Sequence, residues 1–246
     1  MLQEPIQATG LINGAGKNMD LIAGGGGSGW KENWGQEIIA KEIMPRLKPN
    51  DIIIDLCSGE GRVSMPFSMK EAKVILVDLN KEKIKEGDKI RANAGVRKAE
   101  RIIKDVQKLN REQLKGGGTI LLAGDALNHF KKADADKFIK NIRKLLNPNK
   151  RGLIYLNIPS TDSYIFQYPE ACGATRIDES TLEIICDCSG ELKKEPLPFY
   201  KKGELQALLA LQGANIIATN ELEREDSSFL HEVIAEFKPQ NNNQTI

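Results

Sequence analysis

The sequence has few cysteines, and none of them forms a metal-binding pair. The four cysteines among the 246 residues are Cys57, Cys172, Cys186 and Cys188, and no two of them are spaced as C-x-x-C. Structural zinc sites generally use such pairs, so we expect no metal site. Positive and negative charges also nearly cancel, to a formal net charge of +1. A field that would attract nucleic acid or an anionic membrane surface is therefore missing, and we expect neither partner.

Long apolar runs are missing as well. None approaches the roughly 20 residues that a membrane-spanning helix needs. Residues 1–10 also do not show the basic and then apolar order of a signal peptide. We expect a cytoplasmic protein, and either a monomer or a homodimer is compatible with the sequence.

Regular patterns are scarce in residues 1–34, where glycines are frequent. We expect a flexible arm or lid there. The segment GAGKN is similar to a phosphate-binding P-loop, but Leu11 stands where its first glycine is required and Asn18 replaces Ser or Thr. The run GGGGS at residues 24–28 is compatible with an engineered linker. Trp34, at the end of the arm, either packs against the following helix or reaches a ligand when the arm closes.

Residues 51–80 predict a strand, a glycine turn, a helix and a second strand. The run Ile52–Ile54 is short, apolar and β-branched, which is typical of a strand buried on both faces of a parallel sheet. Residues 73–77 form a second such run. Gly59 and Gly61 lie in the turn between them, where the missing Cβ atoms let backbone N–H groups approach a ligand at the start of a helix.

An acidic residue follows each of these two strands. Asp55 comes directly after the first and Asp78 after the second. Ligands of open α/β sheets bind outside the carboxyl ends of the strands, so both carboxylates are expected at one crevice. The helix after Asp78 ends near Gly95, and solvation is enough to explain its many charged residues.

The rest of the chain continues the α/β pattern and then interrupts it. We expect strands at 101–104, 119–123 and 152–158 and a helix at 137–146. Residues 159–198 leave this rhythm, and we expect a short antiparallel insertion that forms a lid or binding surface. Two further strands before residue 238 are joined by a short connection, so they must form a hairpin. We expect a disordered tail over residues 239–246.

The pattern D-L-C-S-G-E-G, which begins at Asp55, resembles motif I of the class I S-adenosylmethionine-dependent methyltransferases. The order of elements over residues 35–238 is similar to the whole fold of that family. The resemblance implies a doubly wound α/β domain with a seven-stranded, mostly parallel sheet in the order 3-2-1-4-5-7-6. Its last strand is antiparallel, and the segment 159–198 is an insertion on the substrate side after strand 5.

The resemblance also implies roles for individual residues. The methionine part of the cofactor would be lined by Asp55, Cys57, Ser58, Gly59 and Gly61. The ribose hydroxyls would bind Asp78, the adenine face would contact Leu79, its edge would meet Asp105 and Val106, and the amino group and sulfonium would lie near Gly124 and Asp125. From the residues alone, Asp105 could equally cap the next turn. Many members have Gly and Cys where this chain has Cys57 and Ser58, a difference of little effect if the contacts are made by the backbone.

The implied reaction transfers a methyl group from S-adenosyl-L-methionine to an O, N or C nucleophile and leaves S-adenosyl-L-homocysteine. His129 is the candidate general base, because it follows the fourth strand and histidine titrates near neutrality; a structural role is the alternative. After that strand the chain reads GDAL and not the N/D-P-P-Y/F of enzymes that methylate base amino groups. We expect a small-molecule acceptor. Protein or RNA methylation, a catalytically silent member and a nicotinamide oxidoreductase are the alternatives.

Overall fold

A computed structural model describes residues 36–96, 98–187, 192–223 and 229–239 of the chain. The predictions for the arm, for Trp34 and for residues 240–246 lie outside these ranges and stay predictions. In chain order the elements are α2 (Gln36–Glu42), η2 (Met44–Arg46), β1 (Ile52–Leu56), α3 (Met65–Met69), β2 (Lys73–Asp78), α4 (Lys81–Asn93), β3 (Glu100–Ile103), η3 (Val106–Lys108), η4 (Glu112–Leu114), β4 (Ile120–Ala123), η5 (Ala126–His129), η6 (Lys132–Asp134), α5 (Ala135–Arg143), β5 (Gly152–Pro159), α6 (Tyr164–Gln167), η7 (Glu170–Cys172), β6 (Thr175–Asp178), β7 (Thr181–Asp187), β8 (Leu192–Pro198), α7 (Glu204–Leu211), β9 (Asn215–Glu223) and β10 (Phe229–Phe237).

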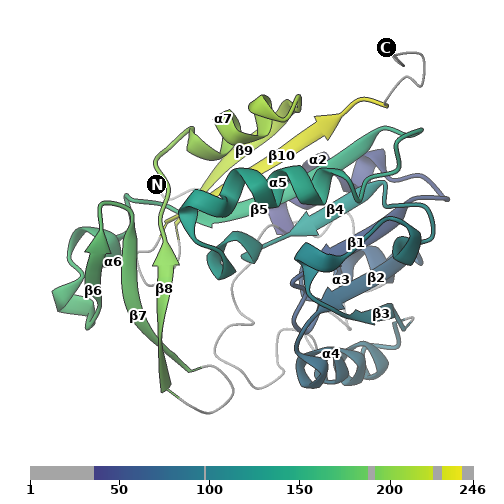
Figure 1. Cartoon of the computed structure of the whole chain (residues 1–246). Coiled ribbons are helices and arrows are strands. Elements are labelled where there is room, and N and C mark those ends of the chain that lie inside the picture. The colour runs from purple at the N-terminus through teal and green to yellow at the C-terminus, as the bar shows by residue number, and fades with distance from the viewer. Residues whose placement is uncertain (1–35, 97, 188–191, 224–228, 240–246) are drawn as a thin grey trace, which may run out of the picture.

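The main sheet has seven strands in the order β3-β2-β1-β4-β5-β10-β9 (Figure 1). The first five pair in parallel, and β10 pairs antiparallel with both β5 and β9. Numbered within this sheet, the order is 3-2-1-4-5-7-6, so the predicted fold class is confirmed. The parallel strands β1, β2 and β4 are buried almost throughout, as their continuous apolar runs predicted.

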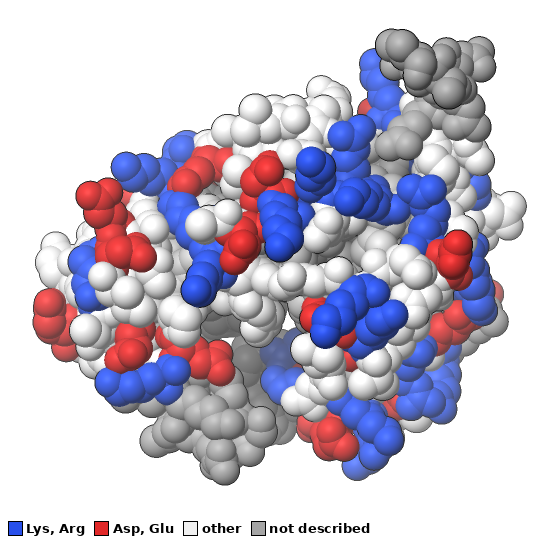
Figure 2. Space-filling model, in the orientation of Figure 1, with Lys and Arg blue, Asp and Glu red and all other residues white. Residues whose placement is uncertain are grey.

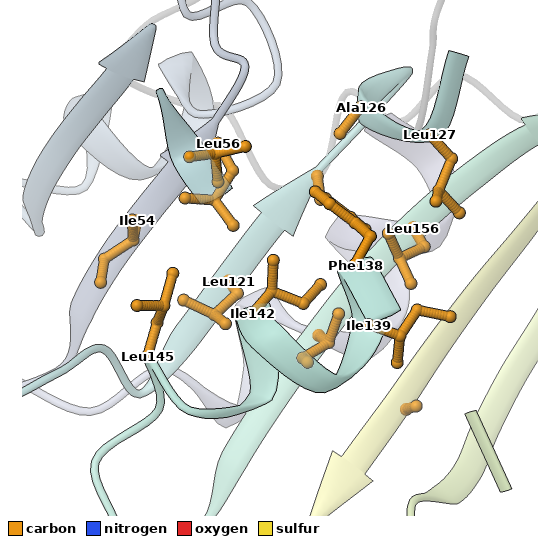
Figure 3. Close-up of a cluster of buried hydrophobic side chains, with 14 of the residues drawn as sticks. Ile54, Leu56, Leu121, Ala126, Leu127, Phe138, Ile139, Ile142, Leu145 and Leu156 are labelled. Atoms are coloured by element: carbon orange, nitrogen blue, oxygen red, sulfur yellow. The ribbon is translucent and has the colours of Figure 1, made fainter. Parts of the chain in front are cut away.

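Helices cover both faces of this sheet and divide the core into two layers. One layer packs α5 and α7 against the sheet, and the other packs α2, α3 and α4 against its opposite face. Figure 3 shows Phe138, Ile139 and Ile142 of α5 pointing toward Leu121 of β4 and Leu156 of β5. None of the helices in the described ranges is long and apolar enough to cross a membrane.

The structure gives the extent of two predicted helices. The helix after the glycine turn is α3, which has only five residues and begins four positions after Gly61. Left-handed backbone at the turn cannot enter an α-helix, and Pro66 suits the first turn of α3 because its missing N–H is not required there. The helix expected at 137–146 is α5, which ends earlier because Leu145 N–H bonds to Ile142 O, a tighter i to i+3 turn.

Residues 159–198 contain α6 and η7 and then a small antiparallel sheet in the order β6-β7-β8, at the left of Figure 1. It has its own core of Ala174, Leu182 and Phe199. The two ends of this insertion meet, because Tyr200 N–H donates to Pro159 O at 2.9 Å and Thr161 N–H donates to Tyr200 O at 3.0 Å. The chain therefore leaves the main sheet and returns to it at one point.

Helix α4 contains one residue that the sequence analysis placed wrongly. The charged residues of this helix were expected to be solvated, but the Arg91 side chain is completely buried. It lies one turn after Gly87, and both face the turn between β1 and α3. A Cβ atom on Gly87 would lie 2.1 Å from Glu60 O. The helix therefore approaches the turn through backbone contact, and a charged side chain fills the space that an apolar one would otherwise take.

We predict that Gly87→Ala lowers the free energy of unfolding by about 1–3 kcal/mol, the usual cost of overpacking. This loss should occur although alanine favours a helix interior over glycine by about 0.5–1 kcal/mol. Urea unfolding of the variant beside Glu86→Ala, an exposed neighbour on α4, measures the effect. Equal stability of the two variants would contradict the close packing.

Candidate functional site

A loop of left-handed residues follows β1. The φ angles of Cys57, Gly59 and Gly61 are 52°, 52° and 75°. The loop closes on itself through Gly61 N–H, which donates to Ser58 O at 2.7 Å, and Ser58 N–H donates to Val77 O of β2 at 3.1 Å. Glycine adopts such angles without cost, whereas Cys57 does so with some strain. The loop is thus held at the carboxyl edge of the sheet between β1 and β2.

Asp78 connects this loop to the beginning of α4. One of its carboxylate oxygens accepts Gly59 N–H and the other accepts Asn80 N–H, both at 2.7 Å. Asn80 caps α4 by accepting from Glu82 N–H and Lys83 N–H. Each carboxylate oxygen can accept a further hydrogen bond, so Asp78 can anchor the loop and still bind two adjacent hydroxyl groups.

Asp55 lies beneath the loop and is almost completely buried. Burial is the main cause that raises the pKa of its carboxyl group to about 7, while hydrogen bonding with Ser64 and the positive charge of Arg91 act in the opposite direction. Its Oδ2 atom is buried without a hydrogen-bond partner among the described residues. The same is true of Ser58 Oγ and, at the end of β4, of Asn128 Oδ1. Unpartnered buried polar atoms are costly, so water or a polar ligand is needed to satisfy them.

Two large apolar side chains are exposed at the ends of β2 and β3. Leu79, which follows Asp78, is 69% exposed, and Ile103 is 47% exposed. Both strands end at one edge, because Asp78 pairs with Ile103 in the parallel register. Close by, Asp105 caps η3 by accepting Gln107 N–H at 2.9 Å, and Val106 is buried. The capping role that the sequence allowed for Asp105 is therefore realised, and its other oxygen is available to a ligand.

The end of β4 is held by a chain of buried polar groups. Asp125 has a left-handed φ of 56°, and its N–H donates to Asn157 Oδ1 on β5. Asn157 Nδ2 donates to Tyr155 Oη at 3.2 Å, and Tyr155 Oη donates to Glu232 Oε1 on β10 at 2.8 Å. Asn220 of β9 completes the chain by donating to Glu232 Oε2. The site is thereby linked to the antiparallel hairpin.

Gly124 lies beside these hydrogen-bonded side chains and faces the glycine loop. A Cβ atom there would lie 3.2 Å from Val63 Cγ2 and 3.5 Å from Tyr155 Cε1. His129, four residues after Asp125, is exposed at the end of η5. No hydrogen bond or ion pair joins the His129 side chain to another of the described residues, so no structural partner fixes its ring.

The structure brings most of the predicted site residues to one edge of the sheet, where β1, β2, β3 and β4 end. The sequence analysis missed four residues around them, namely Val63, Arg91, Tyr155 and Asn157. The sequence carries a signal for Arg91, because Ile84, Gly87 and Arg91 share the helical spacing of a buried stripe. Asn157 interrupts the apolar run of β5, which is itself a sign of a buried polar role. Among the described residues no cluster of three or more His, Cys, Asp or Glu side chains could hold a metal ion.

Comparisons with known proteins agree with this geometry. Residues 53–149 match the family model described as a methyltransferase domain. No curated protein sequence matches the chain.

Solved structures match it more widely. The structure of a SAM-dependent methyltransferase from Methanosarcina mazei has a TM-score of 0.63 at 20% identity, with 79% of this chain and 95% of that chain covered. Magnesium protoporphyrin IX methyltransferase from Synechocystis PCC 6803, with bound SAH, gives 0.63 at 16% identity, with 92% and 96% covered. The 1,6-didemethyltoxoflavin-N1-methyltransferase of Burkholderia thailandensis gives 0.57 at 14% identity, with 96% and 92% covered. At these identities the likeness shows the fold.

The buried carboxyl group of Asp55 predicts a pH-dependent stability. An unfolded aspartate has a pKa of about 3.9, so between there and pH 7 the folded state holds a proton that the unfolded state has lost. The contribution of this group to the free energy of unfolding is complete below about pH 4. It is lost as the pH rises through the folded-state pKa of about 7, by up to about 1.4 kcal/mol per pH unit. We expect Asp55→Asn to remove this dependence in urea unfolding from pH 5 to 8, while the exposed control Asp134→Asn keeps it. Parallel curves for the wild type and Asp55→Asn would contradict the raised pKa.

Proposed function

We propose that this chain, which carries a class I methyltransferase domain, transfers the methyl group of S-adenosyl-L-methionine to an O, N or C nucleophile of a small molecule. The observation that carries this proposal is the arrangement at the carboxyl edge. There the glycine loop is anchored on Asp78, directly beside the exposed side chain of Leu79. The sheet with its antiparallel β10 provides the scaffold.

The residues at this edge suit the cofactor. Asp78 has acceptor capacity left for the ribose hydroxyls, and Leu79 offers an apolar face to adenine, with Asp105 at its edge. In the ionised state of its carboxyl group, the unpartnered Oδ2 of Asp55 suits the ammonium group of the methionine part. A Cβ atom on Gly59 would meet only Lys83 Cδ, at 3.8 Å, so the loop leaves room for a ligand to approach its backbone.

When bound, the cofactor supplies a methyl group that its sulfonium already activates. The chain then has to position an acceptor in line with that methyl group and exclude water. Gly124 and Asp125 border the site at the end of β4. The hydrogen-bonded side chains of Asn157, Tyr155 and Glu232 fix the backbone there. His129 stands one short turn further, and in this proposal one of its ring nitrogens takes the proton of an O–H or N–H acceptor.

The small-molecule acceptor is supported by the position and surface of the insertion. Residues 159–198 follow β5 directly at the carboxyl edge, where they can enclose an acceptor beside the cofactor site. On the face that Figure 2 shows, acidic and basic side chains are interspersed and no broad patch of one sign is formed. Such a surface does not favour a long polyanion. The molecules named for two matched structures, magnesium protoporphyrin IX and 1,6-didemethyltoxoflavin, are small.

Cofactor binding tests the proposal directly. We expect calorimetric titration to show saturable binding of S-adenosylmethionine and S-adenosylhomocysteine, with NADH as the negative control. Asp78→Asn should weaken this binding by about 1–3 kcal/mol, because a charged acceptor of hydrogen bonds is lost. Unfolding measured on the same samples separates this effect from the release of the Gly59 anchor. Binding of NADH alone would overturn the proposal, and unchanged affinity in Asp78→Asn would remove Asp78 from the site.

His129→Ala tests the general base. Methyl transfer from labelled S-adenosylmethionine to a small-molecule extract should fall by about 100-fold or more, since general bases typically contribute 10²–10⁴. Affinity for S-adenosylhomocysteine and thermal stability should stay at the wild-type values. Lys131→Ala, an exposed position two residues away, is the matched control. Retained turnover, or a loss of stability in place of turnover, would rule out His129 as the base.

A further inference from the structure

We infer that Arg91 is a positioning residue for the cofactor site, where its buried guanidinium fixes the glycine loop in the shape that receives the ligand. The inference rests on the proposed function. Arg91 belongs to the last turn of α4 and touches neither Asp78 nor the exposed Leu79. It acts on the loop from the side of α4, through the carbonyl groups of Glu60 and Gly61.

The guanidinium holds the loop by its carbonyl groups. Arg91 Nη1 donates to Glu60 O at 3.0 Å, and Nη2 donates to Gly61 O at 2.9 Å and to Ser64 Oγ at 3.1 Å. Ser64 Oγ in turn donates to Gly61 O at 3.1 Å. Two consecutive carbonyls and the hydroxyl that follows them are therefore bound by one planar cation. A lysine could not span all three, because its ammonium is a single point with a different geometry.

Two glycines make this contact possible. A Cβ atom on Gly61 would lie 2.5 Å from Arg91 Nη2, and one on Gly87 would lie 2.1 Å from Glu60 O. Gly61 is thus required for the guanidinium as well as for its φ of 75°. Gly61 of the loop and Gly87 of α4 are therefore both required for the close approach of Arg91 and α4 to the loop.

The direction of the carbonyls decides where the loop's amides point. A trans peptide places its C=O and the next N–H on opposite sides, so carbonyls that face α4 turn the following N–H groups away from it. One of these, Gly61 N–H, closes the turn on Ser58 O. If the loop opened, the buried guanidinium would lose its acceptors, which is costly for a charge. The loop is therefore preorganised, and ligand binding does not have to order it.

The experiment compares wild-type protein with Arg91→Lys, and with Arg101→Lys as the matched control. Arg101 lies on β3 at the surface, where it pairs with Asp88 of α4. S-adenosylhomocysteine is titrated calorimetrically at a temperature where each variant is shown to be folded, and amide hydrogen exchange is measured for residues 57–64 and for β4. A merely structural arginine would lower the melting temperature but leave ligand affinity and local exchange of the folded protein unchanged.

We expect Arg91→Lys to bind S-adenosylhomocysteine about tenfold more weakly. Exchange in the loop should be about tenfold faster or more, with β4 unaffected. Arg101→Lys should match the wild type in both. Affinity within twofold of the wild type, or unchanged loop exchange in folded Arg91→Lys, would overturn the inference.

Two other results are also decisive. If Arg91→Lys does not fold, Ser64→Ala takes its place, because it removes one acceptor of the guanidinium and leaves the charge buried. It should raise loop exchange and weaken binding in the same direction, and wild-type behaviour would overturn the inference. If the wild type itself binds no S-adenosylhomocysteine, the proposed function fails, whereas faster loop exchange in Arg91→Lys would still show the positioning of the loop.

Discussion

Parallel strands all end at the same edge of a sheet, and the candidate site depends on that constraint. Asp78 and Ile103 end β2 and β3 opposite each other, and Gly124 directly follows β4. Asp55 lies two residues further into the sheet, where the parallel register sets it beside Leu76 and Leu122. Each of these strands is followed by a loop that has to turn back across the sheet, so polar groups and glycines gather there. The apolar layers on either face fix the strands, and the edge takes its geometry from them.

The same edge explains what could be predicted from the sequence and what could not. Strands such as β1 and β4 are continuous apolar runs, and the hairpin of β9 and β10 follows from a connection too short for a parallel crossover. Asp55, Gly59 and Asp78 were found because they come directly after such runs. The length of α3 was not predictable from apolar spacing, since it is decided by left-handed backbone at three positions and by Pro66.

Residues that act from a distance in sequence were also missed. Arg91 lies 30 residues from Gly61, whose carbonyl it binds, and most of the other charged residues of α4 are exposed. Asn157 and Glu232 are polar groups on buried strands, and their partners come from different strands of the sheet. Periodicity reports which face a residue lies on, but a hydrogen bond between separate segments depends on the packed structure. Both groups fasten the loops of the site to the scaffold, one through α4 and the other through the hairpin.

The insertion between β5 and α7 has a further consequence. Its two ends bond to each other through Pro159, Thr161 and Tyr200, and Lys132 ties the returning end by donating to Phe199 O and Glu204. The anchoring contacts thus belong to the scaffold, while the small sheet keeps a core of its own. A segment with joined ends and its own core can be replaced as a unit. Evolution or an engineer could exchange it while the loops at the carboxyl edge of the main sheet keep their shape.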